Sequence, residues 1–428
     1  MKNLTIIAGH VFPQSSPTGK VALQFAEILK EKFQVSIIFI QSGDETYNGS
    51  VKQGLKLYSI FSPRLWLERT FEKCASQRTA PCSIRLFQFA TNIVKFSGRL
   101  GAWFLPVRPK SYWLWPDNLI WYYSKAYKQL EKNNSLENID TLLTINSPFP
   151  AHLAGRKFKK KYPHVRWLTF TIDPFARASD FSKQWLFRSL KARVDTAEEK
   201  GVFKTADLNF VSEEVYETDT EIFSEVIDKV IPIPYLLNKP EPTVGESMFA
   251  QGKINLVYAG RFYRSIRNPE YFLRIFCSME NPDITLHLFT FSDCDDLIDK
   301  YVSLSSGRII RHAPVTTEQI PDILNQANIL VSVGNSTTSF KPSKLFEYLA
   351  TGKPILHINQ SNQHDEVLEK YPLCIQVYPG NISETDTALE IQQFCKAHVH
   401  KQLPWESVNT LFPQHSLENI RNTILSNA

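Results

Sequence analysis

Cysteine is scarce, with six residues in a chain of 428, and no two of them form a Cys-x-x-Cys pair. Zinc sites and redox motifs use such close pairs, and small secreted domains carry cysteine at much higher density. We therefore expect isolated thiols in a reducing compartment. Long apolar runs are also absent: nowhere do about eighteen apolar residues follow one another, so no membrane-spanning helix is expected. The N-terminus shows no cleavable signal pattern.

The chain is too long for one simple hydrophobic core, and its length suits two domains. Hydrophobic residues make up 43% and charged residues 21%, which is ordinary for a globular protein.

Positive charge is concentrated in one segment, although the whole chain carries only +5. Residues 52–128 contain thirteen basic side chains against three acidic ones, together with five of the eight tryptophans. A helical insertion with a solvated basic face is one interpretation. The other is a surface that rests on an anionic membrane, because basic side chains attract anionic head groups and Trp suits the interface. No nucleic-acid-binding motif accompanies the charge, so nucleic acid is not an expected partner.

The first domain, expected over 1–237, alternates strands and helices. Apolar runs predict strands at 4–8, 35–40, 141–145, 167–172, 206–211 and 230–234, and helical spacing predicts helices at 21–29, from about 151, and at 183–203. The nearly continuous apolar character of 35–40 is typical of a parallel sheet that is covered on both faces.

Polar residues follow several of these strands: His10, Asn146, Ser147, His152 and Asp173. Ligands of open α/β sheets bind outside the carboxyl ends of the strands, so these side chains are candidates for a site. An Asp-Pro turn and ordinary loop histidines are the structural alternative.

A polar linker rich in Pro and Gly, 238–252, separates this domain from a second α/β domain over 253–401. Expected strands are 254–259, 284–289, 308–312, 329–333 and 355–358, with helices at 269–279 and 320–326. Gly260-Arg261 is expected to turn out of the first strand. The segment 402–428 is expected to be helical and to return to the first domain.

The stretch 343–358 predicts a helix, a sharp stop and a buried strand. Pro342 suits a helix start, and Gly352 followed by Pro354 suits a helix end. Lys344 and Glu347 share one face of this helix. A surface ion pair would explain them, and so would an anion site with a carboxylate one turn further along.

Three arginines, Arg261, Arg264 and Arg267, follow the strand 254–259. Guanidinium groups stay charged and match phosphate oxygens, so they suit a diphosphate, although a solvated loop would also carry them.

These motifs resemble the retaining glycosyltransferases of family four, which have the GT-B fold of two Rossmann-like domains facing a central cleft. The resemblance rests on Gly260-Arg261-Phe262 with Arg267 and on the run from Pro342 to Pro354. Asn146-Ser147-Pro148, Ala151-His152-Leu153 and Asp173-Pro174 resemble a bacterial branch that acts on surface polysaccharides.

The resemblance implies roles for individual residues. Arg261 and Arg267 would hold the donor diphosphate. Ser343 and Lys344 match the helix start that lies beside the phosphates. Glu347 would hold the ribose hydroxyls. Gly19 matches one of the paired glycines near the donor, and Thr18 stands in place of the other. Ser339 stands where the family has a glutamate that contacts the sugar, which leaves the donor sugar open.

The implied function is transfer of a sugar, with retention of configuration, from a nucleotide-sugar to a lipid-linked or polysaccharide acceptor in bacterial cell-surface glycan synthesis. Asp173 is the first candidate to orient the acceptor hydroxyl or accept its proton, with His152 or His10 next. The Asp293-Cys294-Asp295 motif is interpreted as a loop or helix start rather than a metal site, so no cofactor is expected. The expected location is cytoplasmic, peripheral on the inner membrane face.

Two alternatives remain on the same fold. A nucleotide-sugar 2-epimerase would turn over a sugar nucleotide without an acceptor. A degenerate, non-catalytic copy would bind nucleotide or membrane and activate a partner.

Overall fold

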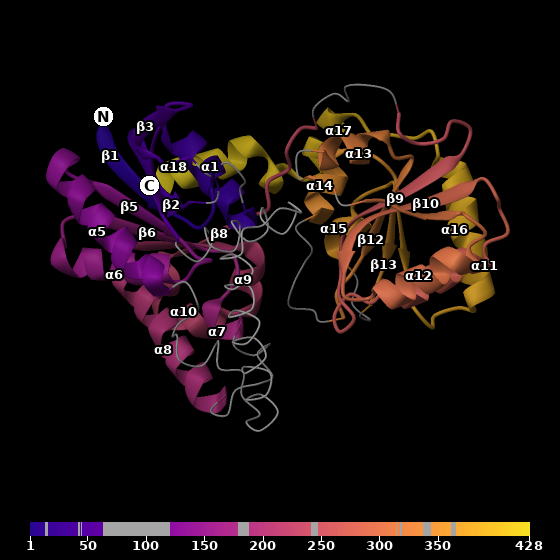
Figure 1. Ribbon diagram of the computed structural model, residues 1–428, viewed down its shortest axis with the longest axis horizontal. Coiled ribbons are helices and arrows are strands. Elements are labelled where there is room, and N and C mark those ends of the chain that lie inside the picture. Colours follow the sequence, from indigo (N-terminus) through magenta and orange to yellow (C-terminus); the bar gives the residue numbers. More distant parts are fainter. Residues whose placement is uncertain are drawn as a thin grey trace, which may run out of the picture. The chain divides into compact units, whose positions relative to one another are not determined.

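The computed structural model describes residues 1–12, 16–41, 43, 45–62, 120–178, 188–240, 247–313, 315–316, 319–336, 344–360 and 365–428. The chain divides into two compact units (Figure 1). The first consists of Met1–Ile233 with Arg421–Ala428, and the second of Pro234–Ile420. Ser339, Ser343 and most of the basic segment lie outside the described residues.

The sheet of the first unit has the strand order β3-β4-β2-β1-β5-β6-β7-β8. Every neighbouring pair is parallel except β3 with β4. The strands are β1 Lys2–Ile7, β2 Phe33–Ile40, β3 Asn48–Lys52, β4 Leu55–Ile60, β5 Thr141–Ile145, β6 Arg166–Thr171, β7 Leu208–Ser212 and β8 Val230–Ile233. Successive strand side chains point to opposite faces, so this sheet builds one apolar core on each side.

Helices cover both faces of this sheet. One face packs against α5, α6 and α8 around Tyr122, Phe158 and Trp167 (Figure 1). On the other face Phe25 of α1 contacts Phe170, with ring centroids 5.1 Å apart. The helices are α1 Pro17–Leu29, α5 Ile120–Glu137, α6 Pro150–Lys161, α7 Phe175–Ala178, α8 Arg188–Thr205, α9 Glu213–Thr218, α10 Thr220–Phe223 and the 3-10 helix η1 Ser224–Lys229.

Two sequence predictions for the first unit were wrong in detail. A helical insertion was one interpretation of residues 52–128, but residues 48–60 form the hairpin β3–β4, with Gln53 and Gly54 both at positive φ in the turn. The helix predicted at 21–29 begins sooner, at Pro17, because Ser16 caps α1 by accepting a hydrogen bond from the Gly19 N–H.

The sheet of the second unit has the order β11-β10-β9-β12-β13-β14, and all pairs are parallel. Counted along the chain this is the order 3-2-1-4-5-6 of a doubly wound sheet. The strands are β9 Ile254–Phe262, β10 Ile284–Ser292, β11 Ile309–Arg311, β12 Ile329–Val333, β13 Ile355–Ile358 and β14 Cys374–Val377. The prediction of an α/β chain with two Rossmann-like domains is therefore confirmed.

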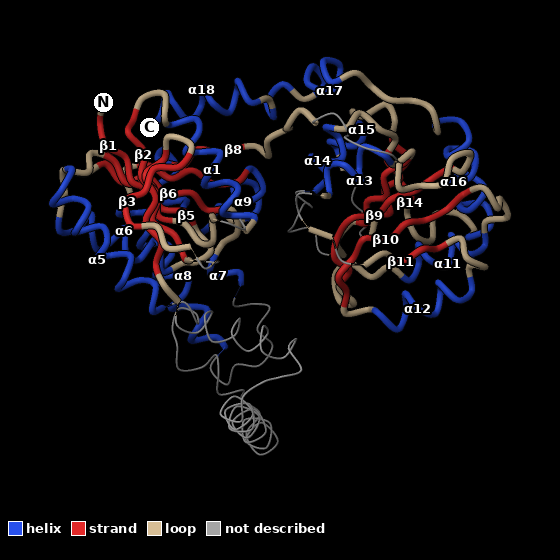
Figure 2. Tube along the Cα trace, turned by 45° about the horizontal axis from the view of Figure 1, so that its top comes forward, coloured by secondary structure: helices blue, strands red, loops and turns tan. Residues whose placement is uncertain are grey.

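The second sheet is also covered on both faces (Figure 2). The core that contains Phe272 and Ile391 lies under α11 Glu270–Ser278, α12 Asp295–Leu304 and α16 Glu384–His398. The core that contains Phe346 and Val408 lies under α13 Ile320–Gln326, α14 Lys344–Ala350 and α17 Trp405–Leu411. The remaining helices are α15 Glu366–Glu369, η2 Pro413–His415 and α18 Leu417–Asn427.

The C-terminal part of α18 belongs to the first unit. Arg421 forms an ion pair with Glu31, and the Lys32 ammonium donates a hydrogen bond to the carbonyl oxygen of Leu425 at 2.6 Å. Arg166 donates to the carbonyl oxygen of Asn427 at 2.7 Å. These contacts fix the end of the chain on the first sheet.

Candidate functional site

The first group of candidate residues lies at the carboxyl edge of the second sheet. Gly260-Arg261 was predicted to turn out of the strand, and this was wrong: β9 continues to Phe262, with Arg261 in register with Phe291 of β10. The ladder to β10 overrides the usual tendency of glycine to interrupt a strand. Arg261 is exposed, and its guanidinium lies 4.9 Å from the ring centroid of Tyr263.

Arg267 connects the ends of β9 and β12. An isolated bridge to Tyr263 brings it back toward β9, where its Nη1 donates a hydrogen bond to the carbonyl oxygen of Arg261 at 3.4 Å. Its Nε donates to Oδ1 of Asn335, just past the end of β12, at 2.9 Å. The sheet order reverses between β9 and β12, and open α/β sheets bind ligands at such a switch point.

Helix α14 brings Lys344 to the same edge. The Lys344 ammonium donates a hydrogen bond to the carbonyl oxygen of Ala259 at 2.8 Å. The Tyr348 hydroxyl donates to that oxygen at 3.2 Å and accepts from the Ala259 N–H at 3.1 Å. Glu347 is exposed on the same helix. Arg267 and Lys344 thus both contact the backbone of β9, at Arg261 and Ala259, whereas Ser339 and Ser343 lie outside the described residues.

Arg264 is directed elsewhere. Its guanidinium forms an ion pair with Asp296 of α12, and its backbone N–H donates to Asp293 at 2.8 Å. That hydrogen bond is the main cause of the lowered pKa of Asp293. Asp295 is paired with Arg311. The two carboxylates of the Asp-x-Asp motif therefore have cationic or N–H partners, and no group of three or more metal-binding side chains occurs among the described residues.

The second group of candidates lies at the switch point of the first sheet, between β1 and β5. Gly19 is in the first turn of α1, where an added Cβ would lie 1.9 Å from the carbonyl oxygen of His10. Thr18, beside it, donates to the carbonyl oxygen of Ser147 at 3.1 Å. Gly19 therefore lets α1 approach the loop after β1, and Thr18 ties it to the loop after β5.

The turn that follows β6 carries Asp173, and hydrogen bonds hold its backbone on both sides. Asn146 donates to the carbonyl oxygen of Asp173 at 2.6 Å, and the Ser212 hydroxyl donates to that of Ile172 at 3.0 Å. Desolvation by neighbouring atoms raises the pKa of the Asp173 carboxyl, and the charge of Arg177 opposes this rise. The Asp173 side chain remains exposed.

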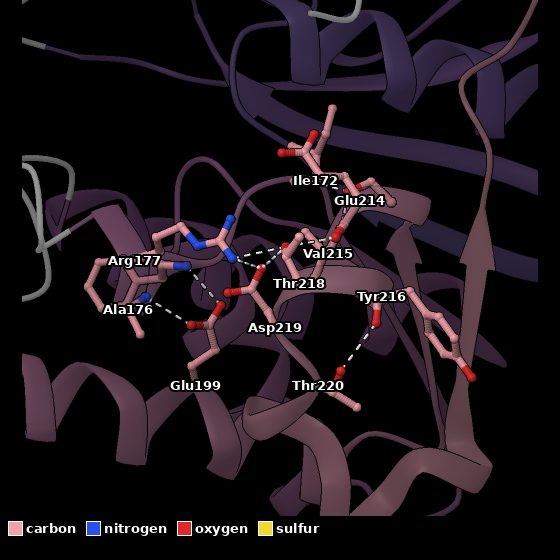
Figure 3. Close-up of polar contacts among 12 residues, drawn as sticks. Ile172, Ala176, Arg177, Glu199, Glu214, Val215, Tyr216, Thr218, Asp219 and Thr220 are labelled. Atoms are coloured by element: carbon pink, nitrogen blue, oxygen red, sulfur yellow. Dashed lines mark hydrogen bonds and ion pairs between the residues drawn. The ribbon is translucent and has the colours of Figure 1, made fainter. Parts of the chain in front are cut away.

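Glu199 of α8 holds the next part of this turn. Its carboxylate accepts the N–H of Phe175 at 2.8 Å. It also accepts the N–H of Ala176 at 2.9 Å (Figure 3). Burial raises the pKa of Glu199 to about 7, the two N–H groups lower it, and Asp219 and Asp195 raise it further. Arg177 lies 2.5 Å from the Asp219 carboxylate and hydrogen-bonds to Thr218 (Figure 3).

His152 lies inside the first unit, 1% exposed. Its Nδ1 is 2.7 Å from the hydroxyl of Thr144, which also accepts the indole N–H of Trp167 at 3.0 Å, and its Nε2 is 3.4 Å from the Thr171 hydroxyl. Burial lowers the pKa of His152 to about 3. This position suits a neutral imidazole that contacts Thr144 of β5 and Thr171 of β6 and so holds the carboxyl ends of these strands together.

Sequence reasoning missed three residues that shape these two edges: Asn335, Tyr348 and Glu199. Asn335 follows an apolar strand, as His10 and Asn146 do, and that signal could have found it. Tyr348 lies within the run from Pro342 to Pro354, but no role was predicted for it. Glu199 is one of several acids on a long helix, and nothing in its sequence neighbourhood distinguishes it.

Comparison with known proteins shows the architecture. No protein-family model matches the chain, and no curated protein matches it in sequence. Solved structures do match over the full length. A sucrose-phosphate synthase from Thermosynechococcus elongatus matches with a TM-score of 0.60 at 12% identity, covering 100% of both chains. The OtsA apo structure matches with a TM-score of 0.61 at 7% identity, covering 100% of this chain and 99% of that one.

The chain has the GT-B fold. A glycosyltransferase from Rickettsia africae is a further match, with a TM-score of 0.56 at 11% identity, covering 99% of this chain and 97% of the other. Both sheets of this GT-B fold present polar side chains at their switch points. None of the described helices is both long enough and apolar enough to cross a membrane.

Proposed function

We propose that the protein is a glycosyltransferase that takes its sugar from a nucleotide-sugar donor. The observation that carries this proposal is that Arg267 and Lys344 contact the backbone of β9 within two residues of Arg261, at the switch point of the second sheet, on a chain with the GT-B fold. Fixed cations at that edge suit a ligand with adjacent phosphates, because guanidinium forks match phosphate oxygens.

The proposed donor contacts are those that the family-four resemblance implies. Arg261 and Arg267 bind the diphosphate, Lys344 and Ser343 lie beside the phosphates, and Glu347 accepts the ribose hydroxyls. Each charge-assisted hydrogen bond is worth roughly 1.5–3 kcal/mol, so losing one weakens binding about ten- to hundredfold. The resemblance also assigns Ser339 to the sugar and Gly19 to the donor.

The leaving diphosphate is stabilised by the two arginines without a metal ion. Support comes from Asp293 and Asp295, whose carboxylates are already engaged by Arg264 and Arg311. Positive groups that are fixed before the reaction stabilise charge as it develops, without reorganisation.

The acceptor side is assigned to Asp173. Its turn is held by Asn146, Ser212 and Glu199, and an ordered carboxylate can orient a hydroxyl or accept its proton. His152 orders the strand ends beneath the turn. The proposed acceptor is a lipid-linked or polysaccharide glycan of a bacterial cell surface, and retention of configuration follows from the family-four resemblance.

Thermal unfolding with a panel of sugar nucleotides tests the proposal, because a ligand that binds only the native state raises its apparent stability. We expect UDP-glucose, UDP-N-acetylglucosamine, GDP-mannose or a related donor to raise the unfolding temperature. If no sugar nucleotide did so, the proposal would fail. Turnover of the bound donor without any acceptor, with inversion at C2 of the sugar, would indicate the 2-epimerase instead.

We also propose a peripheral location on the cytoplasmic face of the membrane. Support comes from the concentration of thirteen basic residues and five tryptophans in residues 52–128, most of which lie outside the described residues. Anionic head groups attract such a segment with about 1 kcal/mol per basic residue near the surface.

A further inference from the structure

Phe291 is a large apolar side chain in an exposed position. It is 60% exposed, near the end of β10, where the chain leaves the core of the second unit. Single exposed apolar residues are common on protein surfaces, so exposure alone says little. Its partner in the sheet is informative, because the register of the parallel ladder places Phe291 opposite Arg261.

Strand periodicity places Phe291 and Arg261 on the same face of the sheet. Two residues earlier, the paired Ala259 and Phe289 both belong to the core under α13 and α14. Side chains two apart on a strand share a face, so Arg261 and Phe291 continue that row past the edge of the core. A further aromatic ring lies beside this row: the His312 ring stacks on Phe289, with ring centroids 4.2 Å apart.

The sheet order shows on which side of Arg261 the other candidate residues and Phe291 lie. Strand β9, which carries Arg261, lies between β12 and β10. Arg267, bound to Asn335 after β12, and Lys344 of α14 lie on one side of Arg261. Phe291 lies on the other side. A ligand whose phosphates contact the cations can therefore extend from Arg261 over the end of β10.

We propose that Phe291 is the platform on which the base of a nucleoside diphosphate stacks. This rests on the proposed function and adds to it the part of the ligand that the arginines do not bind. Every nucleobase has a π-face, so an aromatic side chain supports any base, at roughly 1–3 kcal/mol by analogy with single-strand binding. The chemical class recognised at this edge is a nucleotide rather than a bare diphosphate or a sugar phosphate.

The test measures binding of UDP, ADP, GDP and inorganic pyrophosphate by calorimetry. Phe291→Leu keeps an apolar side chain without a π-face, and Phe291→Trp keeps the π-face. Leu304→Ala is the matched control, because Leu304 is also 60% exposed but lies at the end of α12. Both positions are at the surface. Unchanged circular dichroism and unfolding temperature of the three variants will verify the fold.

We expect Phe291→Leu to weaken binding of the best nucleotide about 5- to 150-fold, and Phe291→Trp and Leu304→Ala to change it less than about twofold. Pyrophosphate binding should be the same in all variants. Unchanged nucleotide binding in Phe291→Leu would overturn the platform and leave the proposed function standing, and so would equal losses for nucleotide and pyrophosphate. If the unmodified protein bound none of the three nucleotides, the platform and the proposed function would both fail.

Discussion

Tyr348→Phe removes one oxygen atom from the support of the candidate donor site. The hydroxyl of Tyr348 is buried, donates to the Ala259 carbonyl and accepts the Ala259 N–H. Lys344 keeps the carbonyl satisfied in the variant, but the N–H loses this partner. Leaving a buried N–H unsatisfied costs about 1–3 kcal/mol. For a unit of this size that corresponds to a fall of roughly 2–12 °C in its unfolding temperature.

Tyr271→Phe provides a matched comparison in the same unit. The Tyr271 hydroxyl is buried and has no hydrogen-bond partner within the part of the chain that the structure describes. Removing it should be neutral or slightly stabilising, because an unpaired polar group is then no longer buried. Differential scanning calorimetry of both variants, following the transition of the second unit, checks the pair. Equal unfolding temperatures for Tyr348→Phe and Tyr271→Phe would refute the hydrogen-bond argument.

Three further predictions concern other parts of the chain. Gly352→Ala should cost at least ~2 kcal/mol of stability, since Gly352 has φ +71° and a Cβ would lie 2.1 Å from the Leu403 carbonyl oxygen. Gly380→Ala is the control: Gly380 has φ +88° with nothing within 4 Å of an added Cβ, so this variant should lose only about 1–2 kcal/mol through backbone strain. Equal urea midpoints for the two variants would contradict this. Glu199 has a pKa of about 7 in the native state against 4.5 for a free carboxyl, so its contribution to folding stability is fully present below about pH 4.5 and is lost as pH rises through 7. The stability of Glu199→Gln should therefore rise relative to that of the unmodified protein between pH 5 and 8, by an amount on the order of 3 kcal/mol. A difference in urea midpoint that stayed constant with pH would refute this. Replacing Arg64, Arg69, Arg78 and Arg85 by Gln should reduce sedimentation with anionic liposomes, and unaltered sedimentation would remove the membrane proposal.

Compact apolar runs made much of the fold predictable from the sequence. Strands β5, β12 and β13 and helix α13 have the predicted bounds. Each of the three strands is a short, mostly apolar run that is followed by Asn or Gly. The β3–β4 hairpin was missed although Leu55 and Leu57 alternate with polar residues after Gln53-Gly54. The hairpin was missed because its second strand was grouped with the basic segment 52–128, which was interpreted as one unit.

The candidate site was predictable in its residue types but not in its connections. A cation-rich segment after a strand is visible in the sequence, so Arg261 and Arg267 could be named. The residues that hold them in place could not be named, because the hydrogen bond from Arg267 to Asn335 spans 68 positions and the one from the Tyr348 hydroxyl to the Ala259 carbonyl spans 89. Strand order decides such contacts, and strand order emerges only from the folded sheet.

The central claim is that Arg261 binds the diphosphate of a nucleotide-sugar donor at the switch point of the second sheet. Calorimetric titration of Arg261→Ala and Arg264→Ala with the sugar nucleotide that most stabilises the unmodified protein tests it most directly. Both arginines are exposed, but Arg261 lies near the end of β9, whereas Arg264 follows the strand and is paired with Asp296. We predict a loss of about ten- to hundredfold in affinity for Arg261→Ala and a change within about twofold for Arg264→Ala. Equal affinities in the two variants would contradict the account.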